Sequence, residues 1–169
     1  MIEITPQRPS DGPLVEQLLD RAFGPERHAR PSYRLRDGLP PIAALCLAAR
    51  LGPRLIGSLR FWSVRLDDRA ALLLGPLAVA GDTRGQGVAK ALIGQGLDRA
   101  RRLGHGPVIA VGEARLFGRF GFVPAPDLVM PAPVPGHRLL GRDLGSDAPL
   151  AGVVRRADAV PVSALRRAI

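Results

Sequence analysis

Residues 72–79 read Leu-Leu-Leu-Gly-Pro-Leu-Ala-Val, and residues 84–89 read Arg-Gly-Gln-Gly-Val-Ala. The first segment predicts an apolar strand that Gly75-Pro76 interrupts. Proline donates no hydrogen bond to a sheet, so Gly-Pro inside a strand indicates a bulge or a splayed edge. The second segment predicts a glycine-rich turn with a helix that begins directly after it. Together the two segments indicate an anion-binding turn between a strand and a helix.

The turn is the part of the sequence that best predicts phosphate binding. The first amides of a helix lack acceptors within the helix and lie at the positive end of its dipole. Gly85 and Gly87 let the backbone approach a bulky anion, while Arg84 and Lys90 flank the turn with positive charge. A dinucleotide fingerprint would need glycine in place of Lys90, and no P-loop Gly-Lys-Ser/Thr occurs. The remaining pattern, [RQ]-x-x-G-x-[GA], is one that a purely structural turn could also satisfy.

The chain as a whole predicts one α/β domain over residues 1–169, with a mixed, largely antiparallel sheet and one strand–helix–strand crossover. Helices are expected from Ser10 or Asp11 to residue 23, in interrupted form within 27–37, from the turn to Leu103, and over 114–120. Strands are expected at 2–5, 43–50, 55–66, 70–79 and 108–111, and weaker ones at 139–144 and 152–156. A loose tail is expected from Ala157.

Composition sets limits on the class of protein. The chain has 169 residues, of which 46% are hydrophobic, so a sizeable core is expected. No apolar run approaches the ~20 residues that span a bilayer, and the start does not have the pattern of a secretory signal. Cys46 is the only cysteine and lies in an apolar run, which favours a buried structural thiol and a reducing, cytoplasmic location.

The order of elements resembles the GCN5-related N-acetyltransferase (GNAT) superfamily. The match is clearest over residues 72–124, where a bulged strand, an Arg-x-x-Gly-x-Ala turn, an amphipathic helix, a buried strand and a short helix ending in Gly-Phe follow one another. Residues 22–24 and 56–60 are similar to the first helix and a central strand of the superfamily. The phrase Arg119-Phe-Gly-Phe-Val-Pro-Ala125 is similar to its YhbS-like bacterial branch. The resemblance covers residues 2–125, and residues 126–169 form a Pro/Gly-rich extension.

This resemblance implies a twisted sheet with two splayed parallel strands, flanked by helices, and acetyl-coenzyme A (acetyl-CoA) as co-substrate in the V-shaped gap between them. Leu77, Ala78 and Val79 would line the gap, and the amide of Val79 would stabilise the oxyanion formed at the thioester. The turn would bind the pyrophosphate through residues that include Arg84, Gly85, Gln86, Gly87, Val88, Ala89 and Lys90. Phe117 would pack against the pantetheine.

The resemblance does not assign the catalytic acid and base to particular residues of this chain. A lysine-like amine has a pKa near ~10.4 in water, so acetyl transfer needs a base, and the departing thiolate needs an acid. Many relatives place a tyrosine acid at the position of Phe117, so a water or another residue would act here, or the activity is weak. Glu113 is the candidate base, although a carboxylate there also suits the helix dipole. Tyr33, on a segment that covers the acceptor pocket in relatives, is the second catalytic candidate.

The leading hypothesis is therefore an N-acetyltransferase that acts on an amine of a small molecule or peptide. A coenzyme A (CoA)-binding regulatory module with little turnover is the first alternative, favoured by Phe117. A basic nucleic-acid-binding protein is the second, favoured by the net charge of +9 but not by any aromatic-interleaved basic stripe. The three histidines and Cys46 show no metal-ligand spacing, so no metal is expected. No membrane partner is expected, and a homodimer is compatible with the resemblance.

Overall fold

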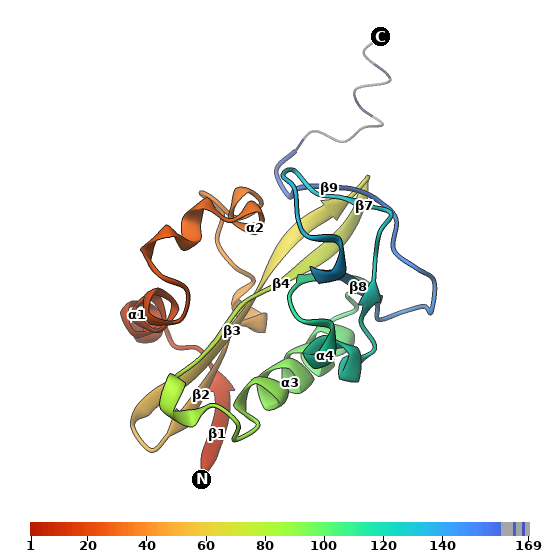
Figure 1. The fold of residues 1–169 in the computed structure, drawn as a ribbon. Helices are drawn as coiled ribbons and strands as arrows, with labels where there is room; N and C mark the ends of the chain where they lie inside the picture. The colour runs from red at the N-terminus through yellow and green to blue at the C-terminus, as the bar shows by residue number, and fades with distance from the viewer. Residues whose placement is uncertain (160–163, 165–166, 168–169) are drawn as a thin grey trace.

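The computed structural model describes residues 1–159, 164 and 167 (Figure 1). Its helices are α1 (Gly12–Phe23), α2 (Pro31–Arg34), α3 (Val88–Arg102) and α4 (Ala114–Phe117). Its strands are β1 (Ile2–Pro6), β2 (Leu47–Leu51), β3 (Arg54–Leu66), β4 (Arg69–Val79), β5 (Pro107–Val111), β6 (Val123–Pro124), β7 (Leu128–Val129), β8 (Leu139–Asp143) and β9 (Gly152–Arg156). Short 3₁₀ turns include Pro25–Ala29, Ala43–Leu45 and Gly81–Thr83.

The strands form a mixed sheet in the order β1-β2-β3-β4-β5-β8-β6. All neighbours in this order pair antiparallel except β4 and β5, which are parallel and connected through α3. The far end of β3 also pairs with β9, and β9 with the short strand β7. The predicted fold class, a mixed and largely antiparallel sheet with one crossover, is confirmed.

Helices cover both faces of the sheet (Figure 1). On one face, Val88, Leu92, Ile93 and Leu97 of α3 pack against buried residues of β2, β3 and β4. On the other, α1 packs Val15, Leu18 and Leu19 against Ala78 of β4. The helix that was expected to run to Leu103 ends at Arg102, and Leu103 is its C-cap residue, with a side chain that is 56% exposed.

The start of α1 differs from the sequence expectation. Asp11 precedes the helix but has helical backbone angles and makes no capping hydrogen bond. Its buried carboxylate instead accepts hydrogen bonds from the Arg8 amide at 2.7 Å and from Arg50 at 2.5 Å. Burial alone would raise the pKa of Asp11, but these hydrogen bonds and the charge of Arg50 lower it overall. The residue therefore ties α1 to β2 and does not act as an N-cap.

One further expectation needs correction. The strand expected at residues 43–50 begins only at Leu47, because Ala43–Leu45 forms a 3₁₀ turn. The interrupted helix expected within residues 27–37 is present as the 3₁₀ turn Pro25–Ala29 followed by α2. Pro31 begins α2, which suits a residue with a fixed φ angle and no amide donor. The hairpin around Gly52-Pro53 is confirmed between β2 and β3.

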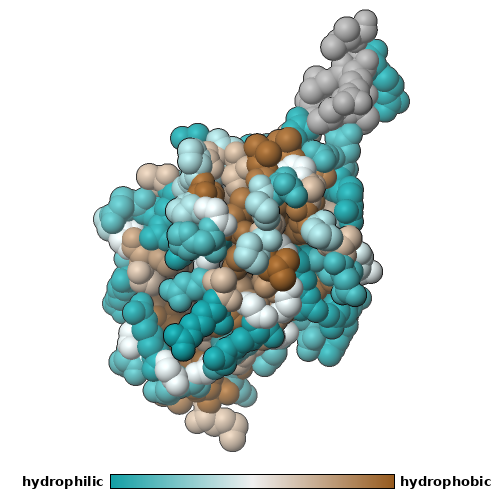
Figure 2. All heavy atoms as spheres, turned by 45° about the vertical axis from the view of Figure 1, so that its right-hand side comes forward, coloured by the Kyte–Doolittle hydropathy of each residue, from teal (hydrophilic) through white to brown (hydrophobic). Residues whose placement is uncertain are grey.

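The C-terminal part adds strands to the sheet and exposed apolar side chains to the surface. The strands expected near residues 139–144 and 152–156 are confirmed as β8 and β9, whereas the two-residue strands β6 and β7 were not foreseen. Val123, Val129 and Val153 of this part are each more than 40% exposed. Figure 2 shows hydrophobic side chains among hydrophilic ones on the face turned toward the viewer. The tail expected from Ala157 falls mostly outside the described residues.

Two glycines of α3 provide a matched test of its packing on the sheet. A Cβ on Gly96 would lie 2.8 Å from a ring carbon of fully buried Phe61, whereas a Cβ on Gly94 would lie 3.5 Å from Phe120. We expect Gly96→Ala to lower the free energy of unfolding by about 1–3 kcal/mol through overpacking. Gly94→Ala should raise it by about 0.5–1 kcal/mol, because alanine is the better helix former. Urea denaturation measures both, and an equal effect of the two changes would contradict the described packing.

Candidate active site

The sheet opens between β4 and β5. The two strands pair in parallel over three positions and no further: Leu72↔Val108, Leu73↔Ile109 and Leu74↔Ala110. Beyond this point β4 remains paired with β3, through Leu59↔Leu77, Ser58↔Ala78 and Gly57↔Val79. Between Leu74 and Leu77, β4 has one residue more than β3 has opposite, so Gly75-Pro76 forms a bulge. The predicted bulge and the splaying of the parallel strands are both confirmed.

The alternation of the backbone decides which amides of β4 face the opening. The amide of Ala80 donates a hydrogen bond to the carbonyl oxygen of Ile56 in β3, at 2.8 Å. Successive amides of a strand point to opposite edges, so the amide of Ala78 also points to β3. The amides of Leu77 and Val79 then point toward β5, where the ladder has already ended. Two donors and two carbonyl acceptors of β4 therefore face the opening.

A cleft of about 630 Å³ occupies this opening. It is walled by the end of α1, by α2, by the bulge of β4, by the turn before α3, and by the segment from β5 into α4. The residues singled out from the sequence that line it are Tyr33, Leu77, Ala78, Val79, Arg84, Gly85, Ala89, Glu113 and Phe117. The fold thus gathers at one place residues that lie in four separate segments of the chain.

Four of the residues expected near the cofactor do not line the cleft: Gln86, Gly87, Val88 and Lys90. The side chain of Val88 is buried in the core between α3 and the sheet. Lys90 lines a different hollow, on the outer side of α3 with Gly94 and Arg101. Val88 can therefore reach a ligand in the cleft only through its backbone.

The turn before α3 presents backbone amides. Gly85 and Gly87 have φ angles of +80° and +81°, which glycine adopts without steric cost. Gly87 is the N-cap of α3, so the amides of the first helical turn have no acceptor within the helix. The buried Thr83 donates its hydroxyl hydrogen to the carbonyl of Ala80 at 2.9 Å and fixes the start of the turn. The positive end of the α3 dipole, the free amides of its first turn and the exposed Arg84 together favour binding of a phosphate group.

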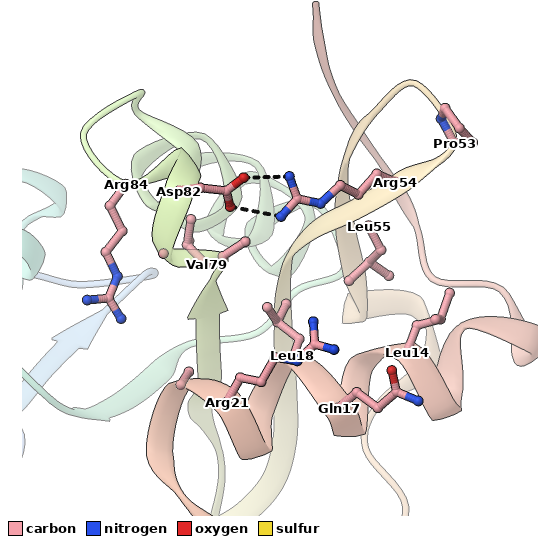
Figure 3. A pocket seen from close by; sticks show the side chains of 13 residues that line it. Leu14, Gln17, Leu18, Arg21, Pro53, Arg54, Leu55, Val79, Asp82 and Arg84 are labelled. Atoms are coloured by element: carbon pink, nitrogen blue, oxygen red, sulfur yellow. Dashed lines mark hydrogen bonds and ion pairs between the residues drawn. The ribbon is translucent and has the colours of Figure 1, made fainter.

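A second hollow of about 520 Å³ lies beside the cleft, between α1 and the same turn. Figure 3 shows Arg54 of β3 facing Asp82 of the turn, with contacts of 2.6 and 2.8 Å, while Arg84 extends away from this pair. Hydrogen bonds from Arg54 lower the pKa of Asp82. Both side chains are more than half exposed, so the pair orients the turn without adding much stability.

The α4 segment supplies one apolar and one charged wall of the cleft. Phe117 is buried, packs edge-on to Phe122 at 5.5 Å between centroids, and lies so close to Gly112 that a Cβ there would meet its ring at 2.5 Å. Glu113 precedes α4 and is exposed. Its backbone carbonyl accepts hydrogen bonds from the amides of Leu116 and Phe117, but its side chain does not cap the helix. The carboxylate is therefore available to the cleft.

Tyr33 is held from the side of α1. The buried guanidinium of Arg27 donates to the Tyr33 hydroxyl at 2.8 Å, to Asp20 at 2.9 Å and to Glu16 at 2.5 Å. Glu16 also accepts a hydrogen bond from Arg60 of β3, at 2.9 Å. Burial would raise the pKa of Glu16, but the hydrogen bonds from the two arginines lower it overall. The phenol oxygen thus accepts from Arg27, which leaves its own hydrogen free to donate.

Three arginines that were not expected from the sequence also line the cleft: Arg30, Arg36 and Arg138. Arg36 is the most unusual of them, because it is buried and stacks near the rings of Tyr33 and Trp62. No motif in the sequence distinguishes it from the chain's other arginines. Only the topology, which sets the segment after α2 beside the bulge, identifies it.

Other chemistry is not evident in the described residues. Within residues 1–159, 164 and 167 no three His, Cys, Asp or Glu side chains come together in a group that could hold a metal ion. In the same part of the chain no helix is long and apolar enough to cross a membrane. Cys46 is a buried free thiol whose hydrogen is donated to the carbonyl of Ile42, and burial raises its pKa. The expectation that the Cys46 thiol is buried is confirmed.

Comparison with known proteins agrees with this geometry. The sequence model of the acetyltransferase (GNAT) family matches residues 13–122. The chain is 33% identical over 117 residues to the uncharacterized N-acetyltransferase YhbS of Escherichia coli (strain K12), a match that covers 68% of this chain and 69% of that protein. It is 32% identical over 131 residues to the uncharacterized N-acetyltransferase YjhQ of the same strain, with coverages of 75% and 72%.

Solved structures show the same arrangement. The crystal structure of YhbS from Escherichia coli in complex with CoA superposes with a TM-score of 0.73 at 28% identity, over 94% of this chain and 89% of that one. A GNAT-family acetyltransferase from Brucella melitensis in complex with acetyl-CoA gives a TM-score of 0.70 at 24% identity, over 94% and 97%, which shows the shared fold.

Fold and sequence together define this protein as an acetyltransferase. More particularly, the chain belongs to the acetyltransferase (GNAT) family and is similar to its YhbS branch. The resemblance stated from the sequence is thus confirmed.

The direction of the β4 amides can be tested in the protein without ligand. We expect the amides of Leu77 and Val79 to exchange with solvent roughly ten-fold or more faster than those of Ala78 and Ala80, because only the latter pair with β3. Hydrogen exchange followed by NMR resolves the four positions. Equal protection of all four would mean that Leu77 and Val79 bond to a neighbouring strand and that the opening is closed.

Proposed function

We propose that this acetyltransferase moves an acetyl group from acetyl-CoA to an amine of a small molecule or peptide. One observation carries the proposal: the amides of Leu77 and Val79 face an opened parallel ladder, and an amide-rich turn lies at the end of the same strand. An extended thiol carrier with a pyrophosphate group needs both features, separated by a length of extended backbone. The CoA and acetyl-CoA complexes of similar proteins support this choice of co-substrate.

In this proposal the pantetheine takes the place that a neighbouring strand would occupy. The exposed amides and carbonyls of Leu77 and Val79 pair with its amide groups, and the ring of Phe117 packs against its chain. The pyrophosphate binds the amides of the turn from Gly85 to Ala89, with Arg84 beside it. The thioester then lies near the bulge, where an amide of β4 polarises its carbonyl. The resemblance assigned this amide to Val79, but the amide that faces the opening beside the bulge belongs to Leu77.

Transfer is direct in this arrangement. The amine nitrogen attacks the thioester carbonyl carbon, the C–S bond breaks, and the thiolate of CoA leaves. The proton lost by the amine passes to a base, for which Glu113 is the carboxylate that lines the cleft. Tyr33, whose hydroxyl hydrogen is free, is the candidate donor to the departing thiolate. Phe117 cannot serve as that acid because it has no ionisable hydrogen.

A matched pair of changes at Gly85 tests the phosphate-binding role of the turn. Gly85 has a positive φ angle and open space at its Cβ position, and both Asn and Asp tolerate that backbone. We expect Gly85→Asp to weaken binding of acetyl-CoA by about ten-fold or more through charge repulsion, and Gly85→Asn to have a much smaller effect. Calorimetry with acetyl-CoA measures both. Equal affinities of the two variants for acetyl-CoA would show that the turn does not bind its phosphates.

Replacement of Glu113 tests the base. Glu113→Gln keeps the shape of the side chain and removes its basicity, so kcat should fall by about 100-fold while the affinity for acetyl-CoA stays the same. Release of free CoA thiol with a panel of amines follows the reaction, and Asp98→Asn on the exposed side of α3 is the matched control. If kcat is unchanged in Glu113→Gln, Glu113 is not the base of the reaction.

A second candidate function rests on Phe117. If the missing acid leaves the protein with CoA binding but little turnover, it acts as a CoA-responsive binding module. The thiol-release assay separates the two functions: saturable binding of acetyl-CoA without thiol release over a broad amine panel would favour the module.

A further inference from the structure

Arg36 is a buried cation with an incomplete set of hydrogen-bond partners. It follows α2, lines the cleft and is only 6% exposed. Its Nε and Nη1 atoms are enclosed and have no hydrogen-bond partner among the described residues. A guanidinium has five N–H donors, and these two atoms carry three of them. A buried charge whose N–H groups have no acceptor costs free energy of folding unless another group compensates it.

The surroundings of Arg36 compensate its charge only in part. Its guanidinium carbon lies 4.5 Å from the ring centroid of Tyr33 and 5.9 Å from that of Trp62. Such cation–π contacts are favourable, but ring faces do not replace hydrogen-bond acceptors for the N–H groups. Burial lowers the pKa of Arg36 overall, to about 10, although the Tyr33 hydroxyl and the charge of Asp37 act in the opposite direction. The side chain therefore remains a cation at neutral pH.

Arg36 lies at the reacting end of the cleft. Its Nη2 atom is 3.9 Å from the position that a Cβ on Gly75 would occupy, so this nitrogen sits at the bulge. The turn that suits phosphate is at the other end of the exposed strand segment, beyond Val79. Arg36 is thus placed beside the thioester and the incoming acceptor, away from the phosphate end.

The charge balance of the cleft favours an anion at this end. Four arginines line it, Arg30, Arg36, Arg84 and Arg138, against one carboxylate, Glu113, among the described residues. The ion pairs found in that part of the chain involve none of these five side chains. With Arg84 assigned to the phosphates, three arginines of the cleft remain for a second anion.

We propose that the acceptor amine carries a carboxylate and that Arg36 binds it at the bulge, an inference that rests on the proposed function. A carboxylate in the guanidinium plane would accept a charge-assisted hydrogen bond from Nη2 and compensate the delocalised charge of the whole group. Arg30 and Arg138 strengthen the positive potential around this position. The substrate class is therefore an amino-acid-like amine, and Arg36 determines specificity within it.

Pairs of acids and amides test the proposal. N-acetylglycine, N-acetylalanine and N-acetylglutamate stand for the product and are compared with their carboxamides, each titrated into protein saturated with CoA. Calorimetry gives affinities, and the fluorescence of Trp62, the only tryptophan in the chain, reports binding near Arg36. We expect at least one acid to bind about ten-fold or more tighter than its amide, a difference that Arg36→Gln abolishes. Arg36→Lys should keep part of it, and Arg102→Gln, at the far end of α3, all of it.

The outcomes are distinguishable from a failure of the proposed function. If acetyl-CoA itself does not bind, the proposed function is wrong. If acetyl-CoA binds but no acid is preferred over its amide, or if Arg36→Gln keeps the preference, the carboxylate proposal is overturned. It is also overturned if Arg36→Gln weakens acid and amide equally, since Arg36 would then act on folding or on acetyl transfer. Should Arg36→Gln fail to fold, Arg36→Lys decides the question: a reduced preference for the acid supports the proposal, and an unchanged preference overturns it.

Discussion

The parting of β4 from β5 at Gly75-Pro76 is the constraint on which the site depends. A parallel pair that continued past Leu74 would use the amides of Leu77 and Val79 for its own ladder. The extra residue of the bulge ends that ladder while the other edge of β4 stays bonded to β3. Backbone polar groups at the centre of the sheet are thereby left for a ligand, which is unusual because such groups are nearly always paired within the protein.

Packing on both faces keeps this opening in place. Gly57 of β3 lets the first turn of α3 approach the sheet, since a Cβ there would lie 2.9 Å from Val88. The amide-rich turn is thus fixed at one end of the opening. On the opposite face, the hydrogen bonds of Arg27 and Glu16 connect Tyr33 of α2 to α1 and to Arg60 of β3. The two sides of the cleft, which the proposed function assigns to the cofactor and to the acceptor, are therefore built by different layers around one strand.

Local sequence patterns predicted the elements whose conformation is determined by neighbouring residues in the chain. Gly-Pro inside an apolar strand indicated the bulge, and the glycine-rich turn before a period-3.6 stripe indicated the start of α3. Asp11 was misjudged because its partner Arg50 is distant in the sequence, so a tertiary hydrogen bond replaced the expected cap. The short strands β6 and β7 carry too few residues for a pattern. Arg36 resembled any surface arginine, and only the arrangement of α2 beside the bulge reveals it as buried.

A crystal structure of the protein with acetyl-CoA tests the central claim most directly. We expect the pantetheine to lie between β4 and β5, with hydrogen bonds to the backbone of Leu77 and Val79, and the pyrophosphate to lie over the amides between Gly85 and Ala89. A complex in which β4 and β5 remain paired beyond Leu74, or in which acetyl-CoA occupies another surface, would contradict this account.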